Sequence, residues 1–338
     1  MAARPTTTST PSQPVTTQSL PAQPALPPAR PAAVTAPPPL AQVLADPVQA
    51  AARQDSLAPL LAKAASVLAA PAAAASFPRP VIEAVVRLLA VRVDLNRAPL
   101  DGKALKEAVL KAGVLSAPAP SQGNARSALL ALRSAALGFL GGEVEPVAPV
   151  GSRPPPPLKG EPPRAPEPRL ALPQLGEEPA ETVRQLLGHT DSALSRLKLL
   201  QHASSPPDAR PGAAALASPE LRVEIPLQLG AETGILQLLV ERDGRRKATP
   251  RERGWRMRFA LNFSATGEVG AEIALFGRAA NIGLWAAEPA TAAALEAMLP
   301  ELAPALARRG LEVTGLHVRR GAPRRQSAAP GQLLDSAR

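Results

Sequence analysis

Residues 255–285 read WRMRFALNFSATGEVGAEIALFGRAANIGLW, and the alternation of side chains in this stretch decides the fold. Apolar residues occupy every second position over 255–261, which is the period of a half-buried strand. Small and polar residues over 264–267 indicate a turn, and the alternation returns over 269–275. A third apolar stretch follows at 282–285. The sequence therefore predicts three consecutive strands.

A helix and a closing strand follow these three strands. From Thr291 to Arg309 the apolar residues recur with the period of 3.6 that marks one face of a helix. Pro300 lies inside this pattern, and a proline in a helix interior removes a backbone hydrogen bond and crowds the preceding turn. We therefore expect the helix to break near Pro300. Alternation resumes over 311–318 as a last strand.

Two further alternating stretches, 221–229 and 235–240, precede the first of these strands. All these elements together predict an α+β domain over residues 220–320, in which an antiparallel or mixed sheet of about six strands is packed by one broken helix. Five of the seven aromatic residues of the chain lie between Trp255 and Trp285. Because aromatic side chains bury the most area, we expect the core to be concentrated there.

The rest of the chain is rich in proline and alanine. With 42 prolines in 338 residues and no repeat period, long stretches lack the apolar bulk that offsets chain entropy. The segments that we predict are a disordered N-terminal tail (1–39), Ala/Leu-rich short helices (40–142), a Pro-rich linker acting as a spacer (143–179), an amphipathic helix (180–203), a second linker (204–219) and a basic disordered tail (321–338).

Four apolar faces of helical period lie within residues 40–142, at 57–68, 81–89, 104–112 and 126–140. Two arrangements fit them. One is a small, weak helical bundle. The other is a set of loosely packed helices of marginal stability, because short isolated helices seldom persist in water. We favour the weak bundle.

The net charge of +10 raises nucleic acid as a partner, but this charge is spread along the chain. Residues 220–320 hold 14 basic and 12 acidic residues, a balance of only +2. The densest basic clusters are Arg242–Arg258 and Arg319–Arg325, and a solvated surface explains both. A basic nucleic-acid-associated protein that uses them is the alternative function. A membrane-surface adaptor ranks last, because the alanine-rich helices lack strongly basic faces with bulky anchors.

The sequence contains no recognisable motif for catalysis or metal binding. Without cysteine the chain has no disulfide framework and no thiolate ligand, and it contains neither a phosphate-binding glycine loop nor a G-x-S-x-G elbow. Glu268 and Glu272 fit a shared, solvated strand face, and His317 has no nucleophile near it in sequence. We predict that the protein is not an enzyme and has no catalytic, cofactor-binding or metal-ligating residue.

Membrane and secretion signals are also missing from the pattern. No run of eighteen apolar residues occurs, and the first residues lack a basic region followed by an apolar stretch. We therefore expect no membrane insertion and a cytoplasmic starting point.

Five features of residues 220–323 follow one another in an order that resembles the C-terminal domain of flagellar hook-length control proteins. They are a strand ending in LNF, a TGEV turn, a hairpin reading AEIALFG then IGLWAAEP, a helix holding LPEL, and RRGLEV leading into GLHVRRGAP. Many members of that family carry a proline and a leucine in the turn, where this chain has Phe263 and Thr266, while Gly267 and Val269 are kept. The stretches LDGKALKEAVLKAGVL and SALLALRSAALGFL are a softer match to some members.

The resemblance implies a non-enzymatic protein that is exported during hook assembly, reports hook length and switches the class of exported substrate. It implies a type III export signal in residues 1–39. The implied partners are the cytoplasmic domain of a flagellar export gate protein and the hook and hook-cap proteins, not nucleic acid. The protein is expected to be a monomer, cytoplasmic before export. The candidate gate contacts, beside exposed sheet edges, are Phe263, Ser264, Ala265, Thr266, Gly267, Glu268 and Val269.

Overall fold

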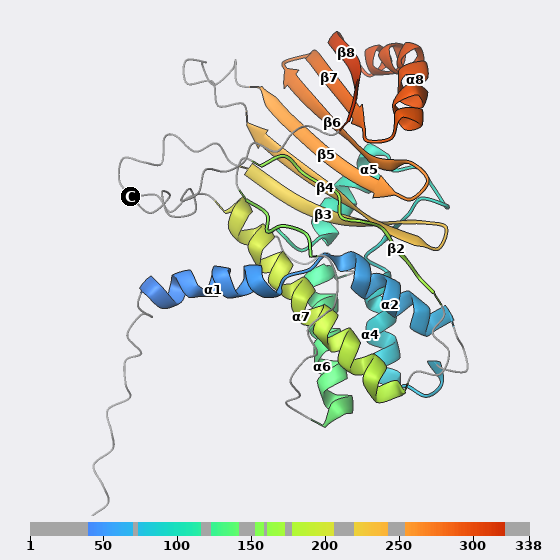
Figure 1. Cartoon of the computed structure of the whole chain (residues 1–338). Helices are drawn as coiled ribbons and strands as arrows, with labels where there is room; N and C mark the ends of the chain where they lie inside the picture. Colours follow the sequence, from blue (N-terminus) through green and yellow to red (C-terminus); the bar gives the residue numbers. More distant parts are fainter. Residues whose placement is uncertain are drawn as a thin grey trace, which may run out of the picture.

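One mixed sheet organises the part of the chain that the structure describes (Figure 1). The computed structural model describes residues 40–69, 74–115, 123–141, 153–158, 161–172, 178–205, 220–242 and 254–321, with the backbone alone at 40–46. Its strands are β1 (Val93–Asp94), β2 (Arg169–Leu170), β3 (Glu220–Leu229), β4 (Glu232–Arg242), β5 (Trp255–Phe263), β6 (Gly267–Phe276), β7 (Ala279–Ala286) and β8 (Glu312–Arg320). The order across the sheet is β1-β3-β4-β5-β6-β7-β8, and β2 pairs with β4.

The sheet is antiparallel from β3 to β7 and parallel at its two ends. The strands β3 through β7 lie in sequence order, and each pairs antiparallel with the next. β8 runs parallel to β7, and a shift of register after Ala280 leaves Thr314 as an extra residue on β8. The expected mixed sheet, with six strands over 220–320, is confirmed.

The helices are α1 (Leu40–Arg53), α2 (Leu57–Ala69), α4 (Arg79–Leu89), α5 (Gly102–Lys111), α6 (Ala125–Leu140), α7 (Pro179–Ser204) and α8 (Pro289–Arg308). Local sequence explains several starts. The Asp101 carboxylate accepts the Ala104 N–H at 2.7 Å and caps α5, and Asn124 with Ser127 forms a capping box at α6. α2, α4, α5 and α6 lie where the four helical faces predicted them.

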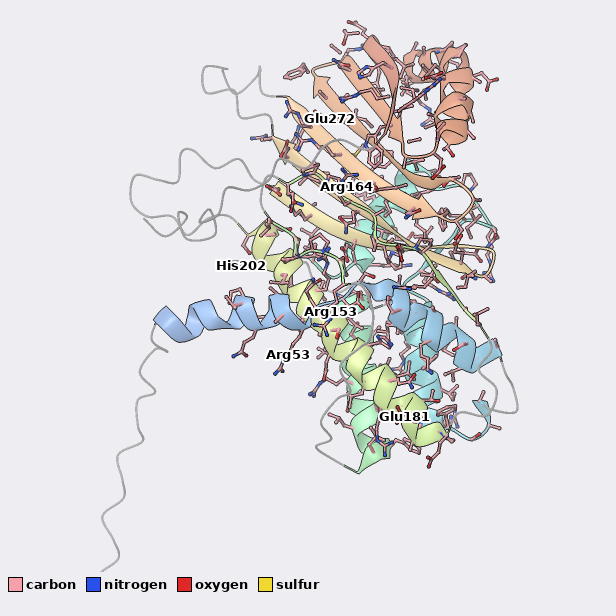
Figure 2. The ribbon with its side chains drawn as sticks, viewed as in Figure 1. Arg53, Arg153, Arg164, Glu181, His202 and Glu272 are labelled. Carbon is pink, nitrogen blue, oxygen red and sulfur yellow. The ribbon has the colours of Figure 1, made fainter. Side chains whose placement is uncertain are left out.

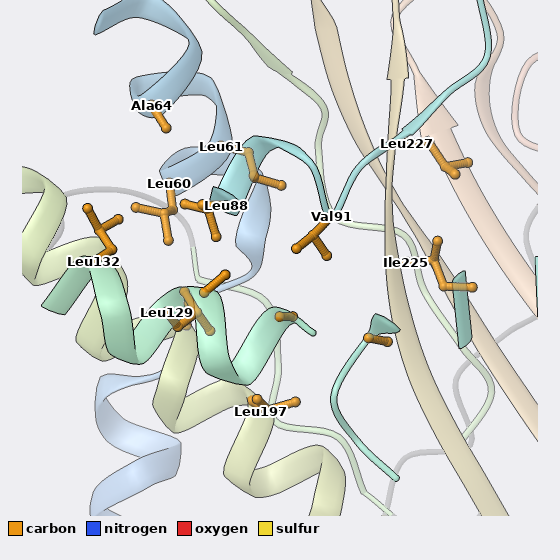
Figure 3. Packing of buried hydrophobic residues seen from close by; sticks show 14 of the residues in the cluster. Leu60, Leu61, Ala64, Leu88, Val91, Leu129, Leu132, Leu197, Ile225 and Leu227 are labelled. Carbon is orange, nitrogen blue, oxygen red and sulfur yellow. The ribbon is translucent and has the colours of Figure 1, made fainter. Parts of the chain in front are cut away.

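The largest buried core lies between these helices and the strand β3 (Figure 3). Its fully buried large side chains come from α2, α4, α6, α7 and β3: Leu60, Leu61, Leu88, Leu129, Leu132, Leu186, Ile225 and Leu227. The short helices therefore do pack together. Their bundle includes α7 and shares its core with the sheet instead of standing alone.

The expectation that the core is concentrated between Trp255 and Trp285 is wrong. Phe259 and Phe263 contact the helical core, but Trp255 is 46% exposed. The physical reason is that different helices cover different strands of the sheet. Leucine-bearing helices cover the apolar face of β3 and β4, whereas α8 covers β7 and β8 with few buried residues of its own. In α8 the buried residue is Ala292.

The helix α8 also differs from the expected break at Pro300. It stays helical through both Pro300 and Pro304 and ends at Arg308. Each proline leaves the carbonyl four residues before it without an N–H partner. Those carbonyls belong to Glu296 and Pro300, which are exposed, so water can pair with them.

We call residues 153–158 and 161–172 the strap. The core residue Leu236 of β4 points to one face of the sheet, and the strap crosses the other face (Figure 1). This face is identified by the alternate strand position Gln237, whose side-chain oxygen accepts the Arg164 N–H at 3.1 Å. β2, at the end of the strap, pairs with β4, and Pro163 is buried. The sequence predicts a spacer here, and the described residues of it pack against the sheet, because polar side chains of the sheet offer partners to the few N–H groups of a Pro-rich segment.

Several predicted segments lie outside the described residues. They are the tail 1–39, the linker residues 206–219, the C-terminal residues 322–338, and 143–152, 159–160 and 173–177 of the Pro-rich stretch. Among the helices that the structure does describe, none has both the length and the apolarity needed to cross a membrane.

Substitution of Leu132 tests the helical core. Leu132→Ala is expected to lower the free energy of unfolding by about 2–5 kcal/mol, because it leaves a cavity between α6 and its neighbours. Leu130→Ala is the matched control on the same helix, since Leu130 is 49% exposed, and it is expected to cost less than about 1 kcal/mol. Urea unfolding of the full chain, followed by circular dichroism, gives both values. Equal losses contradict this packing of α6.

His189 of α7 predicts a pH dependence of stability. Burial, together with the nearby charges of Lys63 and Arg169, lowers the pKa of His189 below its ordinary value of 6.5. The native state therefore favours the neutral ring, and the unfolded chain binds a proton that the native chain does not as the pH falls through its ordinary value. Stability from this group is present above that pH and is lost on acidification.

The corresponding measurement is urea unfolding of the full chain at about pH 7.5 and about pH 5.5. His189→Gln is expected to reduce the loss of unfolding free energy between these two conditions. His202→Gln is the control, because His202 is exposed on the same helix. A loss of the same size in wild type and His189→Gln contradicts the assignment.

Candidate functional site

The predicted contact turn, residues 263–269, joins β5 to β6. Phe263 is buried in the helical core, and its ring packs against Gly234, where an added Cβ would lie 2.9 Å from the ring. Phe263 is therefore a core residue, and its buried side chain anchors the start of the turn to the helical core. Ser264 and Ala265 are exposed, and the other four residues of the turn are half-buried.

Hydrogen bonds hold this turn to β4 and to α8. The Ser264 N–H donates to the Glu232 carboxylate at 3.1 Å, and the Ser264 hydroxyl donates to the same group. The carbonyl of Thr266 accepts the Thr291 hydroxyl at 2.8 Å. Gly267 has φ +65°, the left-handed region that glycine adopts without strain. The turn thus presents a small fixed surface.

Glu268 connects the turn to the strap. Its carboxylate accepts hydrogen bonds from Arg164 Nη1 at 3.2 Å and from the Ala165 N–H at 2.9 Å. The side chains of Arg164 and Glu268 are only 20% and 18% exposed. Figure 2 shows Arg164 lying over the strands of the sheet. One residue of the predicted contact turn is therefore covered by a segment about a hundred positions earlier in the chain.

Trp285 of β7 completes this site. The Arg164 guanidinium lies 5.6 Å from the centroid of the Trp285 ring, within cation–π range. Gly270 pairs directly with Trp285, and an added Cβ there would lie 2.6 Å from the ring, so the ring needs glycine at that position. We call Gln237, Glu268 and Trp285 the arginine clamp.

Sequence reasoning named Glu268 but missed Gln237, Trp285 and Arg164. The only local signal was the smallest residue, Gly270, on one strand and a large ring, Trp285, on the next. Nothing in the residue pattern places the strap over that pair.

A second polar cluster lies under the other end of the strap. Arg196 of α7 donates to the Glu224 carboxylate at 2.7 and 3.0 Å, to Gln54 Oε1 at 2.9 Å and to the Pro155 carbonyl at 2.6 Å. Gln237 also donates to Glu224, at 2.9 Å. The cavity between the strap and these strands has a volume of about 30 Å³, room for a water molecule and not for an organic substrate. The cluster therefore links α7, the strap and the sheet through buried hydrogen bonds.

In the first basic cluster, the described residues Arg256 and Arg258 are paired with acidic residues. Arg256 and Arg258 of β5 lie between Glu241 and Glu272, at N–O distances of 3.3 to 3.8 Å. Glu272 does share a strand face with Glu268, since both occupy alternate positions of β6. This ladder of alternating charges reduces the positive field that a nucleic-acid groove requires.

Arg319 and Arg320 of the second basic cluster lie with His317 on the edge strand β8. Arg319 and His317 are exposed, and Arg320 lies 3.7 Å from Glu296 of α8. Residues 243–253 and 322–325, which belong to the two clusters, lie outside the described residues. Over the described ranges, no three His, Asp or Glu residues gather as metal ligands do.

Comparison with known proteins connects this region to one family. Residues 243–327 match the family model described as flagellar hook-length control protein FliK. The match spans β5–β8 and α8, about a quarter of the chain, and begins where β4 ends. It confirms the resemblance in the C-terminal region. No curated protein and no solved structure matches the chain.

Substitution of Gly270 tests the seating of the Trp285 ring. In Gly270→Ala the new Cβ would meet both that ring and the Phe259 carbonyl, at 2.6 and 2.5 Å. We expect a loss of about 1–3 kcal/mol in unfolding free energy, because the ring or the strand must shift. Urea unfolding and tryptophan emission of the full chain measure it.

The control is Gly283→Ala, on the strand next to Gly270. There the nearest atom to the new Cβ is His317 Nε2 at 3.0 Å, at the end of an exposed side chain that can move. A loss of less than about 1 kcal/mol is expected. If both substitutions cost the same, the ring does not depend on Gly270.

Proposed function

We propose that this protein is an exported flagellar hook-length control protein, a molecular ruler whose C-terminal domain switches the class of exported substrate when the hook is complete. The observation that carries the proposal is the match of residues 243–327 to that family. The family description names a role in flagellar assembly, which argues for a regulatory protein instead of an enzyme. The paired charges around Arg256 and Arg258 disfavour the nucleic-acid alternative.

The part of the chain before β3 suits a ruler in reach. Fully extended, its 219 residues span roughly 700 Å, at about 3.3 Å per residue. No disulfide cross-links them, because the chain has no cysteine. Their helices must unfold to pass through a narrow channel. Many buried positions in those helices are alanine, for example Ala58, Ala64 and Ala84, and each alanine contributes little burial energy.

In this proposal two sets of partners contact different parts of the chain. The hook and hook-cap proteins contact the N-terminal part, and residues 1–39 carry the export signal. The cytoplasmic domain of an export gate protein contacts the turn 263–269 before or during the switch. Ser264 and Ala265 are the exposed residues of that turn. The protein acts as a monomer that starts in the cytoplasm and leaves through the flagellar type III channel.

Deletion of the gene in its host tests the proposal. We expect overlong hooks without filaments, because nothing then reports hook length or switches the exported substrate. Electron microscopy of isolated hooks gives their length distribution. Return of the wild-type gene restores the normal distribution and is the control for effects on neighbouring genes.

Hooks of normal length that carry filaments, in a host without a second copy of the gene, contradict the proposal. If hooks are overlong, the gene with Ser264→Asp and Ala265→Asp tests the contact turn. Overlong hooks from a chain that still folds then support gate contact through the turn. Normal hooks move that contact elsewhere on the domain.

A further inference from the structure

The arginine clamp is built by three neighbouring strands of the matched sheet, and one residue of the strap fills it. Gln237 comes from β4, Glu268 from β6 and Trp285 from β7. Arg164 contacts all three: its N–H donates to Gln237, its Nη1 to Glu268, and its guanidinium covers the Trp285 ring. Three different kinds of contact therefore converge on one residue, one through its backbone N–H and two through its side chain.

The clamp belongs to the sheet and not to the strap. Trp285 is seated by Gly270, and the Glu268 carbonyl accepts the Ala287 N–H at 2.8 Å. Residue Gln237 is fixed by pairing of β4 with Ala260 of β5. The ladder hydrogen bonds fix the backbone of these residues without any contribution from the strap. The sheet therefore presents a preformed site to whatever segment lies over it.

The contacts define what such a segment must carry. A planar guanidinium stacks on an indole ring and pairs with a carboxylate, which a lysine ammonium does less well. Two consecutive backbone N–H groups, those of Arg164 and Ala165, donate to Gln237 and Glu268. The residue before them, Pro163, is buried and has no N–H to satisfy. The matching ligand is an extended segment of the form proline, arginine, small residue.

We propose that the arginine clamp is a peptide-binding site for an extended Pro-Arg-small segment of a partner protein, and that the strap occupies it as an intramolecular competitor. The strap is tethered to the sheet, so its local concentration is in the millimolar range, and a partner segment binds when the strap leaves. The site follows from the contacts of the described residues alone. It goes beyond the proposed function and does not depend on it.

The test uses the full chain and a fluorescent peptide of residues 161–168, EPPRAPEP, which holds a single arginine. To empty the clamp, the chain carries five substitutions in the strap: Glu161→Gly, Pro162→Ser, Pro163→Gly, Arg164→Ser and Ala165→Gly. We call this variant the vacated chain. Fluorescence anisotropy is expected to show binding at least about tenfold tighter than to wild type, because the competitor is gone. Arg164→Gln alone, which keeps a stem over Trp285, is expected to give a smaller gain.

Three matched controls separate arginine recognition from general stickiness. The peptide with Arg164→Ala is expected to lose binding, and the peptide with Arg164→Lys to bind more weakly than the parent peptide. Glu268→Gln in the vacated chain is expected to weaken binding by about tenfold, since it removes the charged acceptor. Circular dichroism shows which of these chains keep their fold.

Several results overturn the proposal. Folded vacated chain that fails to bind the peptide means that the strap is only a structural segment. Equal binding of the alanine peptide means that the surface recognises proline and not arginine. If the vacated chain does not fold, the single variant Arg164→Gln decides. Peptide affinity of this variant equal to that of the wild-type chain overturns the site. None of these results bears on hook length, so the failure of this proposal and of the proposed function are distinguishable.

Discussion

The buried guanidinium of Arg196 is the constraint on which the assembly of this protein depends. Its side chain is 4% exposed and that of Glu224 is 3% exposed. A buried charge is costly unless a partner and further hydrogen bonds satisfy it. Its partners come from the residue that follows α1, Gln54, from the strap through Pro155 and from β3 through Glu224. Four distant segments must therefore be in place together before this group is satisfied.

The helices bury the apolar face of the sheet unevenly from one end to the other. The helical core covers β3 and β4 with α2, α4, α6 and α7, whereas β7 and β8 are covered by α8, in which Met298 is 59% exposed. The matched family region begins after β4, so it contains the thinly covered strands and not the well covered ones. A single continuous sheet carries both parts. The family region thus obtains much of its support from strands and helices outside its own boundary.

The local sequence pattern predicted the helices and strands better than it predicted which of them pack over one another. Alternation located the strands from β3 to β8, and apolar period and caps such as Asp101 located the helices, because both depend on neighbours in sequence. The same reasoning placed the core between Trp255 and Trp285 and gave no role to Glu224. Both differences arise from long-range packing: none of the described helices covers Trp255, and the strap and Arg196 cover Glu224. Alternation shows which face a residue occupies but not what lies on that face.

The candidate site shows the same limit. The turn 263–269 was found because glycine and small polar residues mark turns locally, and its exposed residues Ser264 and Ala265 fit that reasoning. The arginine clamp was missed because it requires a strap residue about a hundred positions away from Glu268. Proline content indicated an extended segment, and the segment is extended. Its attachment follows from partners on the sheet that composition does not reveal.

The contacts of the strap are arranged in series along the chain, and this has a mechanical consequence. Going from its N-terminal end, the chain meets the sheet and helices through Pro155, then the Glu161 carbonyl, then Arg164, then β2. Tension applied from the N-terminal side loads these contacts one after another, not all at once. Such an attachment yields by peeling at low force, whereas the antiparallel strands beneath it share a load across many hydrogen bonds. Once the helices α1 to α6 and the short strand β1, which precede the strap in the chain, have come away, a pull from that side strips the strap before it disturbs the strands β3 to β8.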